Sequence, residues 1–246
     1  MNPLDAIFIL FVSVPAWLAT TKTPTGSMRL RFDHQFGTSA LSLDRDYKTL
    51  NNTTIVLTKF KYYVSNIQLT REDGTVWKEQ KSYHLVEVNE EQTDHTIINL
   101  EGVPQGSYKE LSFFIGIDSV ANHSGEQEGV LDPDYGMFWM WQTGYTFFKI
   151  EGLYTNATGK RNALVLHVGN DNCYKQVRLK IAGKHSRIAE VPAELAIKAD
   201  AQLIFGGNTN IRPVIDAAGE SSISIMSGAK ADQAASNFSH IFSIRE

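Results

Sequence analysis

The densest group of oxidisable side chains in the chain lies in residues 137–149, MFWMWQTGYTFFK. These thirteen residues contain two of the four tryptophans and two of the five methionines. Read as one extended strand, the stretch places Met137, Trp139 and Trp141 on the same face. Its other face is apolar as well, which is typical of a strand buried between two layers. Core packing is the simpler explanation, but an indole can also be modified by oxidation, so redox chemistry is a candidate role.

Three of the seven histidines lie among apolar neighbours. His34 and His240 each stand between two phenylalanines at a spacing of two residues, and His167 follows a Leu-Val-Leu run. A buried imidazole needs a partner, because an unsatisfied ring nitrogen costs about 1–3 kcal/mol. For each histidine alone, a hydrogen-bonded core residue is the simpler interpretation. His84 alternates with valines, and the other three lie in polar loop sequence: His95, His123 and His185.

Inward histidines combined with an oxidisable tryptophan stretch point to a transition metal. Two imidazoles at a dry site without thiolates or clustered carboxylates suit copper. The lone Cys173 excludes an intrachain disulfide and a multi-cysteine cluster, and we expect it to be a small buried hydrophobe. Calcium is a separate candidate in the acidic loop, residues 118–136, which carries alternate carboxylates. The loop lacks an EF-hand pattern, however, which favours solvated charges there.

Bulk properties and missing motifs exclude several other functions. The formal net charge of −4 and the lack of a basic patch argue against nucleic acid as the main partner. The chain has no Gly-x-Ser-x-Gly elbow, no HExxH and no phosphate-binding loop. Aromatic residues and Asn/Asp loops on a β-sandwich could instead form a carbohydrate-binding face, which is the best alternative without a metal.

The pattern of apolar residues predicts an all-β fold. Residues 28–36 alternate strictly, with Leu30, Phe32, His34 and Phe36 on one face. Further strands are expected at 55–69, 77–81, 82–88, 96–100, 108–117, 163–169, 174–181 and 189–201, with short helices at 214–218 and 229–238. We predict an antiparallel β-sandwich, with Greek-key connections and long loops. The loop at 118–136 is longer than most connections, which is typical of a functional segment.

The N-terminal segment differs from the rest of the chain. Residues 6–14 form an apolar run that is too short to span a bilayer, followed by Pro15 and small residues. This pattern resembles a secretory signal peptide cleaved after Ala16 or Ala19, although the segment carries Asp5 and no basic residue. We therefore divide the chain into a signal-like segment at 1–19, a linker at 20–28 and a single domain at 29–246.

Several short motifs occur in order along the chain. YYVSNIQL lies at 62–69 and IGID at 115–118, and a central motif joins DSVAN at 118–122, GVLDP at 129–133, and GMFWMW with GY at 136–145. LHVG at 166–169 and ASNF at 235–238 follow. Together these motifs resemble the MbnP-like family, a group of methanobactin-associated copper proteins of the bacterial periplasm and surface. The similarity extends from about residue 30 to the C-terminus.

This resemblance implies a specific copper site. In the copper-binding members, two histidine nitrogens hold Cu(I) beside a tryptophan that a partner di-haem enzyme has opened to kynurenine. The positions matched here are His34, His167 and Trp139. Trp141 is the alternative modified residue, and Met137 or His240 is a candidate third ligand. The resemblance also implies a di-haem peroxidase-like partner and an outer-membrane copper-uptake partner.

The sequence therefore predicts an exported, non-enzymatic protein that captures or hands on copper in the periplasm or at the cell surface. The rival hypothesis is a surface module that binds glycan or protein, with the aromatic stretch serving as core. In either case we expect the acidic loop to order the aromatic stretch rather than to hold copper. Its short side chains Asp118, Asn122 and Asp132 are well suited to capping turns.

Overall fold

The computed structural model describes residues 23–89, 95–139, 144–183, 187–189, 193–212, 214–215 and 221–245. The signal-like segment at 1–19 lies outside these ranges, as do Trp141 and His185. Within the described ranges, no helix is long and apolar enough to cross a membrane.

Strand β1 (Thr25–Phe36) has the predicted alternation. Leu30, Phe32, His34 and Phe36 are buried, while the residues between them are partly exposed. The strand begins at Thr25, inside the segment expected to be a linker. Because the period of two continues to Phe36, one face of β1 points into the core over most of its length.

A five-stranded sheet is built around β1. Its order is β16 (Phe242–Ile244), β13 (Ala193–Asp200), β1 and β2 (Ser39–Ala40), and β7 (His95–Pro104) also pairs with β1. The pairing of β1 with β13 is parallel, whereas we predicted antiparallel strands. A parallel pair requires a long crossover, and most strands of the other sheet lie between β1 and β13 in the sequence. This sheet is therefore mixed.

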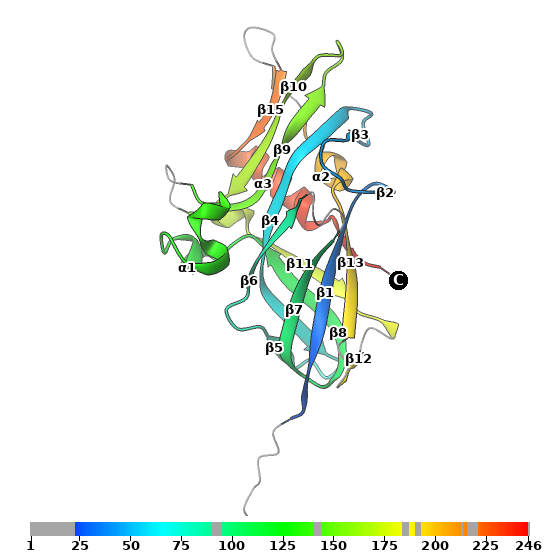
Figure 1. Ribbon diagram of the computed structural model, residues 1–246, viewed down its shortest axis with the longest axis vertical. Coiled ribbons are helices and arrows are strands. Elements are labelled where there is room, and N and C mark those ends of the chain that lie inside the picture. Colours follow the sequence, from blue (N-terminus) through cyan, green and yellow to red (C-terminus); the bar gives the residue numbers. More distant parts are fainter. Residues whose placement is uncertain are drawn as a thin grey trace, which may run out of the picture.

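Within the described residues, the larger sheet has eleven strands and is centred on the long strand β4 (Thr54–Arg71), which runs through the middle of the molecule (Figure 1). Along one edge of β4 lie β9 (Thr146–Thr155) and then β8 (Gly106–Ile115). The opposite edge carries β3 (Asp46–Lys48), β6 (Tyr83–Val88) and β5 (Val76–Lys78). Beyond β9 follow β10 (Arg161–Gly169), β15 (Ser221–Ile225) and β14 (Val214–Ile215), and β8 pairs with β11 (Lys175–Lys180) and β12 (Arg187–Ile188). The β10–β15 pair is also parallel.

Helices are short and lie between the strands. Helix α3 (Gly228–Ser239) confirms the helix predicted at 229–238. The prediction of a helix at 214–218 was wrong for its first two residues, which form β14. Helix α2 (Gln202–Gly206) was not predicted. The acidic loop contains α1 (Ser119–Asn122) and the 3-10 turns η1 (Gly129–Leu131) and η2 (Pro133–Tyr135), and η3 (Asp171–Cys173) precedes β11.

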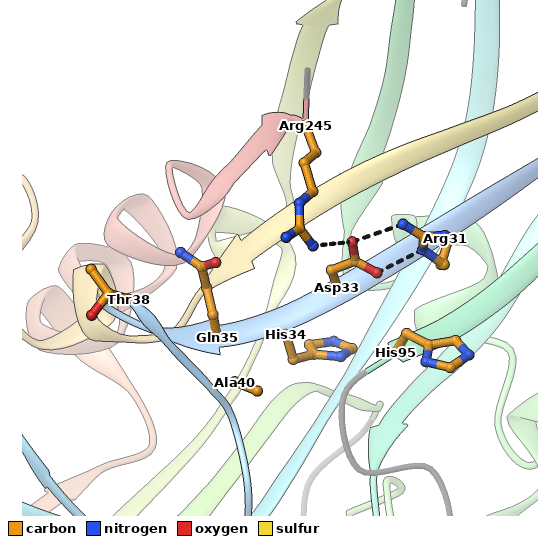
Figure 2. Close-up of a pocket in the computed structure, with 8 residues that line it drawn as sticks. All are labelled: Arg31, Asp33, His34, Gln35, Thr38, Ala40, His95 and Arg245. Carbon is orange, nitrogen blue, oxygen red and sulfur yellow. Dashed lines mark hydrogen bonds and ion pairs between the residues drawn. The ribbon is translucent and has the colours of Figure 1, made fainter.

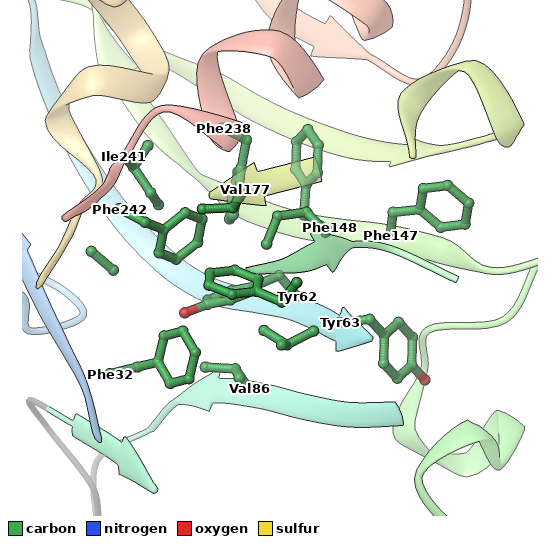
Figure 3. Close-up of a cluster of buried hydrophobic side chains, with 14 of the residues drawn as sticks. Phe32, Tyr62, Tyr63, Val86, Phe147, Phe148, Val177, Phe238, Ile241 and Phe242 are labelled. Atoms are coloured by element: carbon green, nitrogen blue, oxygen red, sulfur yellow. The ribbon is translucent and has the colours of Figure 1, made fainter. Parts of the chain in front are cut away.

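An aromatic cluster fills the space between the two sheets (Figure 3). Phe238 of α3 stacks on Phe148 of β9 with ring centroids 4.6 Å apart, and its ring lies 5.2 Å from that of Tyr62. Phe242 of β16 contacts Phe32 of β1 at 6.2 Å. Such pairs contribute about 0.5–1.5 kcal/mol each beyond the burial of their surface. The two packed layers with a shared core confirm the prediction of a β-sandwich.

Residues 137–149 do not form one continuous strand. Phe138 pairs with Tyr145, and the Trp139 amide donates to the Gly144 carbonyl at 3.1 Å, so the chain turns back on itself before β9 begins. Gly144 has φ +126°, which favours glycine, and a Cβ there would lie 2.6 Å from the Asn122 side chain. The prediction of a single strand was wrong because alternation carries no information about this turn.

Candidate metal-binding residues on two faces of one sheet

His34 lies in the core between the two sheets. Its side chain is almost fully buried, and its Nε2 atom lies 3.0 Å from the hydroxyl oxygen of Tyr62. The rings of Phe60 and Tyr62 each stand 5.9 Å from the imidazole, at steep angles. Burial raises the pKa of Tyr62, so its hydroxyl keeps its proton. His34 therefore points inward, as predicted, and has a neutral phenol as a hydrogen-bonding partner.

A second histidine lies near His34. β7 pairs with β1 as far as Asp33 and His95, and β2 pairs with β1 from Gln35 onward, so His34 stands where one partner strand ends and the other begins. A cavity of about 370 Å³ opens at this point, and both histidine rings line it (Figure 2). The sequence placed His95 in a solvated loop. Only the strand register reveals that it lies opposite Asp33.

His167 lies on the outer face of the large sheet. It stands opposite Lys149 of β9, and Lys149 stands opposite Lys61 of β4. Residues directly opposite one another point to the same side of a sheet. Tyr62, which contacts His34, follows Lys61 and points to the other side. The structure therefore does not bring His34 and His167 together, although both were assigned to one site.

A carboxylate holds His167 in place. The Nε2 atom of His167 lies 2.8 Å from Oε1 of Glu151, and Lys59 contacts Oε2 of the same carboxylate at 3.1 Å. Burial lowers the pKa of His167, Glu151 opposes this effect, and Lys149 and Lys59 add to it. The imidazole is therefore neutral at neutral pH. Burial alone would raise the pKa of Glu151, but its hydrogen bonds with Lys59 and His167 lower it overall.

Trp139 lies at the same end of β10 as His167. A Cβ placed on Gly169, two residues beyond His167, would come within 3.3 Å of the Trp139 ring. The residue is only 7% exposed. Lys149, opposite His167, donates from Nζ to the Gly136 carbonyl at 3.0 Å, three residues before Trp139. The segment that carries Trp139 is therefore attached to the strand pair that carries His167.

The remaining predicted ligands lie elsewhere or outside the described residues. Met137 is fully buried in the hydrophobic core. His240 was expected to face inward with its aromatic neighbours, and this was wrong: it follows the last turn of α3, is exposed, and its Nδ1 lies 2.7 Å from the Ser236 carbonyl oxygen. Residues two positions apart point to different sides of a helix but to the same side of a strand. The helical conformation therefore turns His240 away from the side of buried Phe238. Trp141 lies outside the described residues.

The acidic loop is anchored through its short polar side chains. Asp118 caps α1 and accepts hydrogen bonds from the Ala121 amide and the Tyr83 hydroxyl. Asn122 accepts from the Tyr145 amide at 2.8 Å and thereby holds the residue that pairs with Phe138. Asp132 accepts from the Asp134 amide at the start of η2. Of these side chains, Asn122 connects the loop to the aromatic segment, Asp118 connects it to β6 through Tyr83, and Asp132 acts within the loop.

No metal cluster built only from His, Cys, Asp or Glu occurs within the described part of the chain. No three such residues are placed to hold one ion, and this includes the acidic loop, where calcium was a candidate. Calcium therefore has no support from the structure. A site at His167 would need other donor types, or donors outside the described ranges.

Comparisons with known proteins identify the family. The family model described as MbnP matches residues 25–227, and no curated protein matches. A solved structure, MbnP from Methylosinus trichosporium, superposes with a TM-score of 0.56 at 16% sequence identity, covering 80% of this chain and 83% of that one. At this identity the superposition shows the fold alone, whereas the family model covers most of the sequence. The chain belongs to the MbnP family.

Proposed function

We propose that this protein binds copper outside the cytoplasm and captures it or hands it on without catalysing a reaction of its own. The observation that carries the proposal is the family match over residues 25–227, because the methanobactin-associated members handle copper. We place the centre of the site at His167, beside Trp139. Export rests on the signal-like N-terminal segment, which lies outside the described residues.

The environment of His167 suits a metal ligand. Its Nε2 atom faces Glu151, so Nδ1 is the nitrogen left to bind an ion. Histidine ligands in proteins commonly donate their other ring N–H to a carboxylate, which fixes the ring and raises its basicity. Imidazole is a good ligand for copper, and the neutral form is the one that binds. When bound, copper would add a redox-active centre next to the Trp139 segment.

Trp139 is the residue that we propose is oxidised. It lies next to Gly169 at the C-terminal end of β10, and a separate di-haem enzyme would draw electrons from the indole. With a peroxide as the oxidant of this peroxidase-like partner, the indole C2–C3 bond is cleaved and the C2 carbon leaves as formate. Conversion to kynurenine therefore adds about 4 Da, because one carbon is lost and one oxygen is gained. Peptide mass spectrometry of protein from its native host, compared with protein produced alone, tests this step. An unmodified Trp139 and Trp141 in native protein would contradict it. An outer-membrane copper-uptake protein is the proposed second partner.

A second candidate function is the binding of a glycan or another protein. It is favoured by a hollow of about 640 Å³ between the turns at 51–53 and 156–158 and residues 210–212, lined mainly by amide and hydroxyl side chains. Such groups hydrogen-bond well to sugars. However, Tyr154, the aromatic residue of this lining, is buried and presents no exposed ring for stacking.

Metal content separates the two functions. Protein purified gently after exposure to copper should retain about one ion per chain, measured by inductively coupled plasma mass spectrometry. Absence of stoichiometric copper together with saturable binding on a glycan array would favour the second function. Copper at one ion per chain that survives gel filtration would favour the first.

A further inference from the structure

The cavity beside His34 is lined by side chains that do not suit a metal cation. Two guanidinium groups, those of Arg31 and Arg245, face it together with one carboxylate, Asp33 (Figure 2). Burial would raise the pKa of Asp33, but its hydrogen bonds with both arginines lower it, so the carboxylate stays charged. The cavity lining therefore carries two positive charges against one negative charge.

The two arginines differ in how many hydrogen bonds they donate to carboxylates of the protein. Arg31 donates from Nε and Nη2 to Asp33, and from Nη1 to Glu194 at 2.6 Å. Arg245 donates from Nη1 to Asp33 at 3.0 Å, and 63% of its side chain is exposed. A guanidinium has five N–H donors in a fixed planar arrangement, which matches the oxygens of carboxylates and phosphates. Arg245 can therefore donate to a bound anion while Asp33 holds it in place.

The side chain of Gln35, on the same strand as Asp33, adds another hydrogen-bond donor to the cavity lining. Figure 2 shows the Gln35 amide on the same side of β1 as Arg245, and the ring of His34 on the other side. The cavity lies where the pairing of β1 passes from β7 to β2 and the residue after it, Leu41, so its position follows from the sheet topology. Its volume of about 370 Å³ is at the lower end of the range for small-molecule sites.

We propose that this cavity binds a compact oxyanion, a small carboxylate or a phosphate, through Arg245. The guanidinium of Arg245 supplies the anion-binding fork, and Asp33 orients it. This site is separate from the outer face on which His167 lies. It does not depend on copper, so the proposal can fail or succeed independently of the proposed function.

Isothermal titration calorimetry on the full-length, metal-free protein tests the proposal, with citrate, phosphate and acetate as probes at matched ionic strength. We expect saturable binding of citrate or phosphate at about one per chain, with Kd near 1 mM or tighter. The two anions distinguish a carboxylate ligand from a phosphate ligand. Arg245→Gln should weaken binding at least tenfold.

Arg178→Gln is the matched control, because Arg178 is 60% exposed and also donates to one carboxylate, that of Glu110, at 2.9 Å. It should change Kd less than twofold. Anion-induced shifts in the NMR spectrum of the wild-type protein should appear at Arg245 and His95 rather than at Arg178. Equal weakening by both substitutions, shifts spread over both arginines, or no saturable binding of any probe would overturn the proposal.

Discussion

The two histidines on either side of the large sheet have different chemical surroundings. His34 of β1 packs against its inner face, and His167 of β10 lies on its outer face. On the inner face, His34 contacts the neutral hydroxyl of Tyr62 within an aromatic cluster. On the outer face, His167 contacts the charged carboxylate of Glu151, which Lys59 also contacts. The inner pair satisfies two buried polar groups and thereby stabilises the core. The outer pair holds a neutral imidazole at a partly exposed, charged surface, which is where an ion can reach it.

Replacing His34 should have the largest effect on stability. His34→Ala leaves a cavity in the core and deprives the Tyr62 hydroxyl of its partner, so we expect the free energy of unfolding to fall by about 2–4 kcal/mol. Urea denaturation measures this loss, and copper stoichiometry of the folded fraction should stay at the wild-type value. Lost copper at unchanged stability would instead make His34 a ligand and reverse the assignment of the two faces.

Replacing Asp118 should have a smaller effect on stability. Asp118→Ala removes the cap of α1 and the acceptor for Tyr83, so the free energy of unfolding should fall by about 0.5–2 kcal/mol. Differential scanning calorimetry should show a lower melting temperature while copper stoichiometry is retained. If copper is lost and the melting temperature is unchanged, the acidic loop takes part in metal binding and does more than hold the tryptophan segment.

The smallest effect is the pH dependence that arises from His167. Its folded-state pKa is lowered below the unfolded value of 6.5, mainly by burial. Below that pH the unfolded chain binds more protons, so stability should decline as pH falls through about 6. Because the side chain is partly exposed, we expect this contribution to the free energy of unfolding to be under about 1 kcal/mol. Comparing wild type with His167→Gln in urea titrations between pH 5 and 8 isolates this contribution. A His167→Gln curve parallel to that of wild type would contradict it.

The inward position of His34 could be predicted because apolar and polar residues alternate over nine residues of β1. In a strand with one buried face, this alternation determines the side on which each side chain lies. His167 could not be assigned a face in this way, since Leu164, Val165 and Leu166 precede it without alternation. The charged residues opposite it come from β9 and β4, and only the register brings them there. Local patterns therefore predicted the sandwich but not the sides on which the candidate ligands lie.

Two other differences between sequence and structure have the same origin. The pairing of Phe138 with Tyr145 is accompanied by a positive φ at Gly144 and by the contact of Tyr145 with Asn122, which is distant in sequence. His95 reaches the cavity because β7 pairs with β1 in one particular register. His240 is different: the helix predicted at 229–238 already implied a period other than two, so the sequence contained the signal that it leaves the face of Phe238.

The most direct test of the central claim compares two histidines with the same partner. His167 and His84 each lie 2.8 Å from a glutamate oxygen, and their side chains are 19% and 24% exposed. Competition with a chromophoric Cu(I) chelator under anaerobic conditions gives the copper affinity of each alanine variant. We predict that His167→Ala weakens binding at least about 100-fold, or about 2.8 kcal/mol, and that His84→Ala leaves it unchanged. Equal losses in both variants, or wild-type affinity in His167→Ala, would contradict a copper site on the outer face.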